Sequence, residues 1–229
     1  MPATDPARTL HTPAGDLVLD EYRLRLDGRE WSVLHTGSVL SFWEEQRFLS
    51  EERDRVPYGV TLWPASIALA HDVAGRGDAL RGARVLELGA GTGLPGIVAA
   101  SLGARVVQTD RHELALDVCR RNGARNAVRD VEYRLADWTR WEETRRYDWI
   151  LGADVSYSEA THPHLRHVLA TSLAPGGRVL LADPFRPFSL RLLEALEGDG
   201  WAIALAKWRV GDDEAPRAIG VFELTAPPA

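Results

Sequence analysis

From residue 83 to the C-terminus, short apolar runs alternate with longer segments of helical periodicity. Near-continuous apolar strands of this kind are typical of a parallel sheet that helices cover on both faces. The last two strands have no helix between them, so we expect one of them to pair antiparallel at the edge of the sheet. The pattern predicts an α/β fold with a mostly parallel sheet. The predicted strands are 85–88, 105–109, 131–135, 147–152, 178–182, 201–208 and 218–224, and the predicted helices are 64–73, 94–102, 112–125, 161–173 and 189–196.

The residues before this α/β pattern predict a smaller N-terminal region. Residues 1–16 contain several prolines and small polar side chains, which indicate a mobile arm. Alternating apolar residues on both sides of Asp27-Gly28 predict a β-hairpin, because both turn residues tolerate a positive φ. The charged segment 41–56 lacks apolar periodicity, so we expect a loop or short helix there. These patterns divide the chain into three parts. Residues 1–16 are the mobile arm, residues 17–57 are the hairpin with a lid or extension, and residues 58–229 are the α/β domain.

The composition limits the partners of the chain. With 229 residues, a formal net charge of −6 and 45% hydrophobic residues, the chain has an ordinary globular balance that excludes intrinsic disorder as the main state. Its acidic charge argues against a nucleic-acid partner, because phosphate contacts need clustered cations. No apolar run approaches the roughly 20 residues that span a bilayer, and the N-terminus lacks a signal pattern. We therefore expect a cytoplasmic protein without membrane or nucleic-acid partners, and among oligomeric states a monomer is favoured.

We expect no metal site. Cys119 is the single cysteine, which excludes a disulfide framework and a cysteine-based zinc site. His162, His164 and His167 have no carboxylate or cysteine at a matching spacing. They lie at the start of a predicted helix, where surface and capping roles are more common than metal binding.

The segment from Val85 to Gly96 carries the most informative pattern in the chain. A strand runs into three alternate glycines, Gly89, Gly91 and Gly93, and then into a helix. Glycine is needed in such a turn because a Cβ atom would block the approach of a ligand to the backbone. The N–H groups of the following helix add positive potential. The loop also fits the G-x-G-x-x-G pattern of dinucleotide-binding proteins, so on its own it leaves two ligand classes open.

Acidic residues near the strand ends favour S-adenosylmethionine (SAM) over a dinucleotide. Glu87 lies two residues before the first glycine, where its carboxylate can meet the ammonium group of SAM but would repel a pyrophosphate. Asp110 closes the next strand and can accept the ribose hydroxyls of either ligand. Asp137 and Trp138 follow the third strand and offer a carboxylate and an indole for an adenine. The alternative roles are a buried ion pair for Glu87, a helix cap for Asp137 and packing for Trp138.

Four stretches, 85–96, 109–110, 136–138 and 147–154, follow one another along the first four predicted strands. They resemble the successive motifs of class I, seven-β-strand SAM-dependent methyltransferases, and the resemblance covers roughly residues 58–224. It implies a Rossmann-like sheet in the order 3-2-1-4-5-7-6 with strand seven antiparallel. It also implies SAM as the cofactor and S-adenosylhomocysteine (SAH) as its product. The cofactor-binding residues would be Trp63, Glu87, Gly89, Ala90, Gly91, Thr92, Gly93, Asp110, Arg111, Asp137, Trp138 and Ala153.

Two shorter motifs narrow the resemblance. Residues 59–64, Gly-Val-Thr-Leu-Trp-Pro, are similar to the Trp-Pro segment before the glycine loop in the protein-lysine methyltransferase branch. Residues 154–157, Asp-Val-Ser-Tyr, are similar to the Asp/Glu-x-x-Tyr motif of that branch. The branch includes the enzymes acting on valosin-containing protein and on the electron transfer flavoprotein beta subunit. The resemblance implies a protein substrate with an exposed lysine, and Asp154 and Tyr157 as catalytic residues.

The chemistry of a lysine acceptor agrees with these positions. Asp154 and Tyr157 follow the fourth strand, and open α/β sheets bind ligands at the carboxyl ends of their strands. A lysine with its ordinary pKa near 10.4 is protonated at pH 7 and has no lone pair with which to attack. Asp154 can orient the ammonium and help release its proton. Tyr157 and Trp63 can line the channel that receives the lysine side chain. Helix capping by Asp154 and core packing by Tyr157 or Trp63 are the alternative roles.

Three other interpretations of function stay open. They are a small-molecule N-methyltransferase similar to nicotinamide N-methyltransferase, a SAM-binding protein without transfer activity, and an oxidoreductase that rests on the G-x-G-x-x-G match alone. The intact set of Glu87, Asp110, Asp137 and Asp154 argues against a pure binding protein. Residues 183–187, after the fifth strand, either shape the substrate entrance or form a rigid turn.

Overall fold

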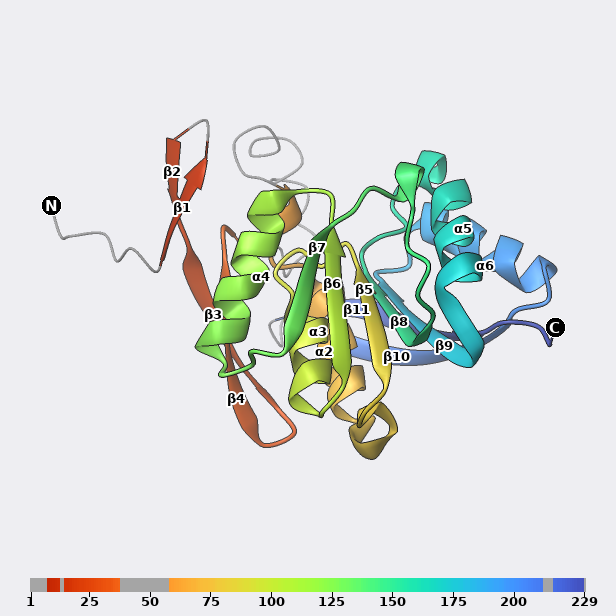
Figure 1. The fold of residues 1–229 in the computed structure, drawn as a ribbon, viewed down its shortest axis with the longest axis horizontal. Helices are drawn as coiled ribbons and strands as arrows, with labels where there is room; N and C mark the ends of the chain where they lie inside the picture. The colour runs from red at the N-terminus through yellow and green to blue at the C-terminus, as the bar shows by residue number, and fades with distance from the viewer. Residues whose placement is uncertain (1–7, 13–14, 38–57, 212–215, 229) are drawn as a thin grey trace, which may run out of the picture.

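The computed structural model describes residues 8–12, 15–37, 58–211 and 216–228, so the charged segment 41–56 falls outside the described residues. A seven-stranded sheet runs in the order β10-β11-β9-β8-β5-β6-β7 (Figure 1). Its neighbouring strands are parallel except β11, which pairs antiparallel with β9 and β10. This topology confirms the predicted fold class. The strands are β5 Arg84–Leu88, β6 Arg105–Asp110, β7 Val131–Leu135, β8 Tyr147–Ala153, β9 Leu173–Asp183, β10 Ala202–Val210 and β11 Arg217–Thr225.

Helices cover both faces of the sheet. They are α2 Pro64–Ala74, α3 Leu94–Ser101, α4 Glu113–Arg125, α5 His162–Ser172 and α6 Pro187–Gly198. Because alternate strand residues point to opposite sides, Val85 and Leu151 belong to the core with α2 and α3, whereas Leu86 and Ile150 belong to the core with α5 and α6. The central strands are therefore buried on both sides, which explains why their sequences are apolar runs rather than alternating patterns.

The predicted hairpin comprises β3 Asp20–Leu26 and β4 Arg29–His35 and lies beside α4 (Figure 1). A side chain of α4 holds β4 in place. Asn122 Oδ1 accepts a hydrogen bond from Leu34 N at 2.7 Å, and Asn122 Nδ2 donates to Leu34 O at 3.1 Å. The same Nδ2 donates to Thr92 O at 2.8 Å. One buried amide thus ties the hairpin to the glycine loop.

A second hairpin, β1 Thr9–Thr12 with β2 Gly15–Val18, occupies part of the region expected to be a mobile arm. Leu10 is only 1% exposed and belongs to a small core that also contains Leu19 and Leu34. Burial of this side chain favours a fixed position for the strand that carries it. The described residues of the predicted mobile arm therefore differ from the prediction, because they form a paired β-hairpin.

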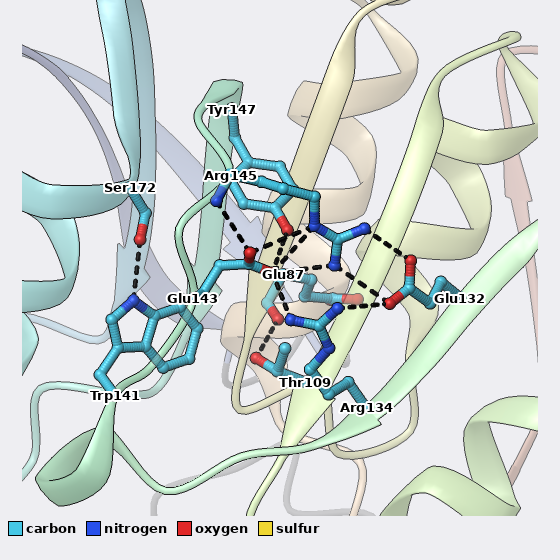
Figure 2. A network of polar contacts seen from close by, with 9 residues as sticks. All are labelled: Glu87, Thr109, Glu132, Arg134, Trp141, Glu143, Arg145, Tyr147 and Ser172. Carbon is cyan, nitrogen blue, oxygen red and sulfur yellow. Dashed lines mark hydrogen bonds and ion pairs between the residues drawn. The ribbon is translucent and has the colours of Figure 1, made fainter.

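The chain between β7 and β8 is anchored by an ionic network and by one indole (Figure 2). The network consists of Glu132, Arg134, Glu143, Arg145 and Tyr147. Burial raises the pKa of Glu143, but hydrogen bonds from Arg145 and Tyr147 outweigh it and hold that pKa at about 2. Trp141 Nε1 donates to Ser172 Oγ on α5 at 2.9 Å. Both anchors hold the segment that follows β7, which contributes to the cavity described next.

Candidate active site

A cavity lies at the carboxyl ends of β5, β6, β7, β8 and β9, the edge at which open α/β sheets bind ligands. The predicted site residues on its wall are Trp63, Gly89, Gly91, Asp110, Arg111, Asp137, Trp138, Ala153, Asp154 and Tyr157. The other residues on its wall, which were not predicted as site residues, are Gly59, His112, Ala136, Thr139, Val155, Thr161, His164 and Arg186. Segments far apart in the sequence thus meet at one site because parallel strands end at the same edge.

The glycine loop between β5 and α3 allows close approach to its backbone. Gly91 has a φ of 58°, and a Cβ atom there would lie 3.0 Å from Gly59 O. Gly93 has a φ of 78° and precedes α3, and a Cβ atom there would lie 2.8 Å from Cys119 Sγ. Both positions therefore require glycine for conformation and for space. Cys119 is buried and its thiol donates to Gly91 O at 3.2 Å, so it supports the loop.

Asp110 ends β6 with its carboxylate beside the cavity. Its Oδ2 accepts from Gly91 N at 3.1 Å, and its Oδ1 accepts from His112 N at 2.9 Å. Burial raises the pKa of Asp110 in spite of these hydrogen bonds. A carboxylate accepts several hydrogen bonds at once, so Asp110 can hold the loop and accept ligand hydroxyls together.

Glu87 does not line the cavity, although we expected it to meet the ammonium group of SAM. Its side chain is buried between β5 and α3, where Glu87 Oε2 accepts from Gln108 Nε2 at 2.6 Å. Gln108 Nε2 also donates to Gly93 O at 2.7 Å. Burial raises the pKa of Glu87 to about 8, so the side chain is mostly neutral at pH 7. In the structure Glu87 therefore supports the glycine loop from the protein interior, through the Gln108 side chain that contacts both.

This buried carboxyl group predicts a particular pH dependence of stability. The folded protein keeps the Glu87 proton up to a pH of about 8, whereas the unfolded chain loses it near 4.5. The free energy of unfolding should therefore fall as the pH rises between these values, by at most about 1.4 kcal/mol per pH unit from this group. Glu87→Gln, which cannot titrate, should flatten that fall. Urea unfolding of both proteins across this range checks it, and identical slopes would contradict the assignment.

Three more residues expected to bind the cofactor, Ala90, Thr92 and Gly93, also lie away from the cavity wall. Ala90 and Thr92 are 6% and 2% exposed, because alternate residues of the loop point into the protein. Of the residues of the glycine loop, only Gly89 and Gly91 line the cavity.

Asp137 and Trp138 bring the third strand end into the site. Asp137 Oδ1 accepts from Thr139 N and from Thr139 Oγ1, each at 2.9 Å, which caps a short 3-10 helix and lowers the pKa of Asp137. The indole of Trp138 lies beside the glycine loop, since a Cβ atom on Gly89 would be 3.7 Å from its Cζ2 atom. Asp137 thus combines the capping role with a place on the cavity wall.

The most consequential feature that the sequence did not predict is an ion pair on Asp154. Arg186 Nη1 pairs with Asp154 Oδ1, and Arg186 Nη2 donates to Asp154 Oδ2 at 3.3 Å. Arg186 comes from the turn after β9, where its backbone N–H donates to Asp183 Oδ1 at 2.7 Å. Arg186 is therefore held by a turn hydrogen bond and lines the cavity, while a role of residues 183–187 at the substrate entrance stays a prediction. Tyr157, 44% exposed, lines the same cavity three residues after Asp154.

These features fit SAM. The cavity brings together a glycine loop with no room for side chains, a carboxylate at the second strand end, and an indole with a carboxylate after the third strand. In a sheet of this order, such a site defines a class I SAM-dependent methyltransferase. Within the described ranges, no three histidine, cysteine, aspartate or glutamate side chains gather as a metal site. The same ranges contain no helix with the length and apolar character needed to cross a bilayer.

Comparison with known proteins places the chain within this class. Residues 44–187 match the family described as lysine methyltransferase, and the chain belongs to that family. It is 36% identical to protein N-lysine methyltransferase METTL21A from Xenopus tropicalis, over 60% of this chain and 66% of that protein. It is 39% identical to METTL21A from Danio rerio, over 66% of this chain and 72% of that protein. Histone-arginine methyltransferase METTL23 from Mus musculus is 37% identical over 44% of this chain and 43% of that protein.

Solved structures agree with this fold. The chain aligns with the 16S rRNA N2 G1207 methyltransferase RsmC from T. thermophilus at a TM-score of 0.60 and 22% identity, over 91% of this chain and 51% of that chain. It aligns with magnesium protoporphyrin IX methyltransferase from Synechocystis at a TM-score of 0.57 and 15% identity, over 79% and 94% of the two chains. At these identities the likeness concerns the fold, while the acceptor depends on the residues of the site.

Proposed function

We propose that this chain transfers a methyl group from SAM to the side-chain amine of a lysine on a protein. The observation that carries the proposal is the place of Asp154, a carboxylate that shares one cavity wall with Asp110 and Gly91. The family match and the METTL21A relatives favour the same acceptor. An acidic side chain beside the proposed cofactor site favours binding of an acceptor that arrives as a cation, because opposite charges attract.

The proposed roles follow from the positions of the side chains. Asp110 accepts the ribose hydroxyls, and Asp137 and Trp138 receive the adenine. SAM, when bound, supplies an electrophilic methyl group, so the acceptor amine needs a free lone pair and an aligned approach. Asp154 orients the incoming ammonium and accepts its proton as a general base, which then passes to water, and the exposed ring of Tyr157 packs against the aliphatic stem of the lysine.

An arginine acceptor is the second candidate, because METTL23 from Mus musculus is named as a histone-arginine methyltransferase. A guanidinium binds a carboxylate best through two parallel hydrogen bonds. Arg186 already contacts both oxygens of Asp154 in this way. A compact ammonium needs only one contact, which favours lysine.

The experiment that tests the proposed function is transfer of label from methyl-labelled SAM into a gel-filtered lysate of the cells from which the gene comes. We expect label in discrete protein bands, and trypsin digestion with mass spectrometry should find mono-, di- or trimethyl-lysine. The matched control is the Asp154→Ala protein under the same conditions. Label that enters only small metabolites would instead support a small-molecule N-methyltransferase, and binding of SAM without transfer would support a binding protein.

The location and assembly of the protein stay predictions. We propose that the protein has no nucleic-acid partner, on the basis of the acidic net charge of −6, and a cytoplasmic location and a monomeric state stay predictions from the sequence. We also propose residues 58–229 as the catalytic unit, with 17–57 as an extension.

A further inference from the structure

The turn after β9 builds a charged triad around the proposed acceptor site. Arg186 bridges Asp154 and Asp183, and its Nη1 atom lies 3.3 Å from Asp183 Oδ2. Asp183 is held in turn, because its Oδ1 accepts from Arg186 N at 2.7 Å and its Oδ2 accepts from Ser189 Oγ at 2.6 Å. The side chains of Asp183, Asp154 and Arg186 are 2%, 8% and 21% exposed, so water screens their charges only in part.

The backbone at both ends of this triad is strained. Asp154 has a φ of 59° and Phe185 a φ of 62°, although neither is glycine. Asp154 N donates to Ala182 O at 2.9 Å, which joins the ends of β8 and β9. Left-handed conformations of such residues cost about 1 kcal/mol or more each and persist where the surroundings fix them, often at functional sites. The Asp154–Arg186 pair is therefore a fixed part of the cavity wall.

We infer that Arg186 is a positioning residue that sets the charge at the methyl-transfer position, which makes it a determinant of how an amine acceptor is bound. Two carboxylates and one guanidinium give the triad a net charge of −1. Without Arg186 the net charge would be −2, which would bind an ammonium more tightly and keep its proton in place. Arg186 therefore weakens binding of the protonated acceptor and eases release of its proton. This inference rests on the proposed function.

Other charged groups also face this space from neighbouring elements. Those of the described residues are Asp110, Arg111, His112, Asp137, Tyr157 and His164. They come from β6, from the loops after β6, β7 and β8, and from α5. They are unchanged in variants of the triad, so a series of such variants isolates the triad's own charge.

The test compares two ligands that need no acceptor. In sinefungin a carbon atom replaces the sulfur of SAH, and this carbon carries an amine, protonated at pH 7, at the position of the transferred methyl group. Calorimetry at pH 7 gives Kd for both, and the ratio of the SAH Kd to the sinefungin Kd reports how well the site accepts a cation. Arg186→Met should raise this ratio roughly tenfold, since one full charge is removed near a partly buried site. Asp183→Asn should lower it by a similar factor, while Arg186→Lys should stay near wild type.

Two features keep this test decisive. If Arg186→Met fails to fold, the isosteric Asp183→Asn and the charge-conserving Arg186→Lys still give two points of the series. Arg191→Met is the matched control, because Arg191 lies on α6, which begins directly after Arg186, but pairs with Glu159 and stacks on Phe188 outside the cavity wall. Its ratio should equal that of wild type.

The outcomes are distinguishable. If wild type binds both ligands but the ratio stays within about twofold across the triad variants, Arg186 does not set the charge of this site and the inference is overturned. If wild type binds neither ligand, the proposed SAM-dependent function itself fails. With a known acceptor, Arg186→Met should lower both KM and kcat, and a rise in KM alone would also overturn the inference.

Discussion

Asp154→Ala is expected to lower the rate of methyl transfer by about 100-fold or more while changing the Kd for SAH by less than about threefold. The reason is that Asp154 stands after β8, away from the glycine loop and the carboxylate of Asp110, for which we propose the cofactor contacts. Its carboxylate should act on the acceptor amine, whose charge changes during transfer. Loss of an interaction of that kind lowers turnover and efficiency together.

Initial rates of label transfer into lysate protein, combined with calorimetry for SAH, separate these two effects. Asp154→Asn should behave like the alanine variant, because it keeps the shape of the side chain but removes its charge. Tyr157→Phe is the milder comparison, since a ring that only packs against the acceptor stem keeps that function without its hydroxyl group. If Asp154→Ala abolishes SAH binding and the remaining bound enzyme turns over normally, Asp154 belongs to the cofactor site instead.

Asp110→Ala should weaken binding of SAM and SAH by about 1.5–3 kcal/mol, which is a rise in Kd of roughly tenfold to 150-fold. The variant loses the ribose contacts and also the hydrogen bonds from Gly91 N and His112 N that shape the loop. Because burial raises the pKa of Asp110, wild-type affinity should fall as the pH decreases, beginning above the range of an ordinary aspartate.

Calorimetry on purified protein at several pH values measures this effect. Asp130→Ala is the control, because it removes an exposed carboxylate just ahead of β7, outside the cavity wall. Circular dichroism should show that Asp110→Ala keeps its fold, since the carboxylate faces the cavity. An SAH affinity within about twofold of wild type would mean that Asp110 is not the ribose ligand.

The sequence predicted those parts of the molecule that depend on local patterns. Residues 85–88 and 147–152 are apolar runs because both sides of their strands are buried, so the sheet could be inferred before its order was known. Asp110 and Asp154 were found because each directly follows such a run, and parallel strand ends meet at one edge. Gly91 and Gly93 were singled out because alternate glycines separate a strand from a helix, and the structure shows that neither position has room for a Cβ atom.

The features that escaped prediction depend on tertiary contacts. Arg186 and Asp154 lie 32 positions apart in the sequence, and the only local signal of Arg186 was a turn at the same sheet edge. Glu87 precedes the glycine loop as expected, but the direction of its side chain is set by Gln108 on the neighbouring strand. The β1–β2 hairpin lies in a proline-rich segment, and its burial depends on residues such as Leu34.

The central claim is that this cavity methylates lysine nitrogen on a protein. It is tested most directly by labelling lysate protein with methyl-labelled SAM, hydrolysing the protein completely to amino acids and separating the labelled products. We expect label to elute with ε-N-methylated lysines and to disappear with Asp154→Ala. Label that elutes with N-methylated arginines, or that persists unchanged with Asp154→Ala, would contradict the assignment of a lysine acceptor.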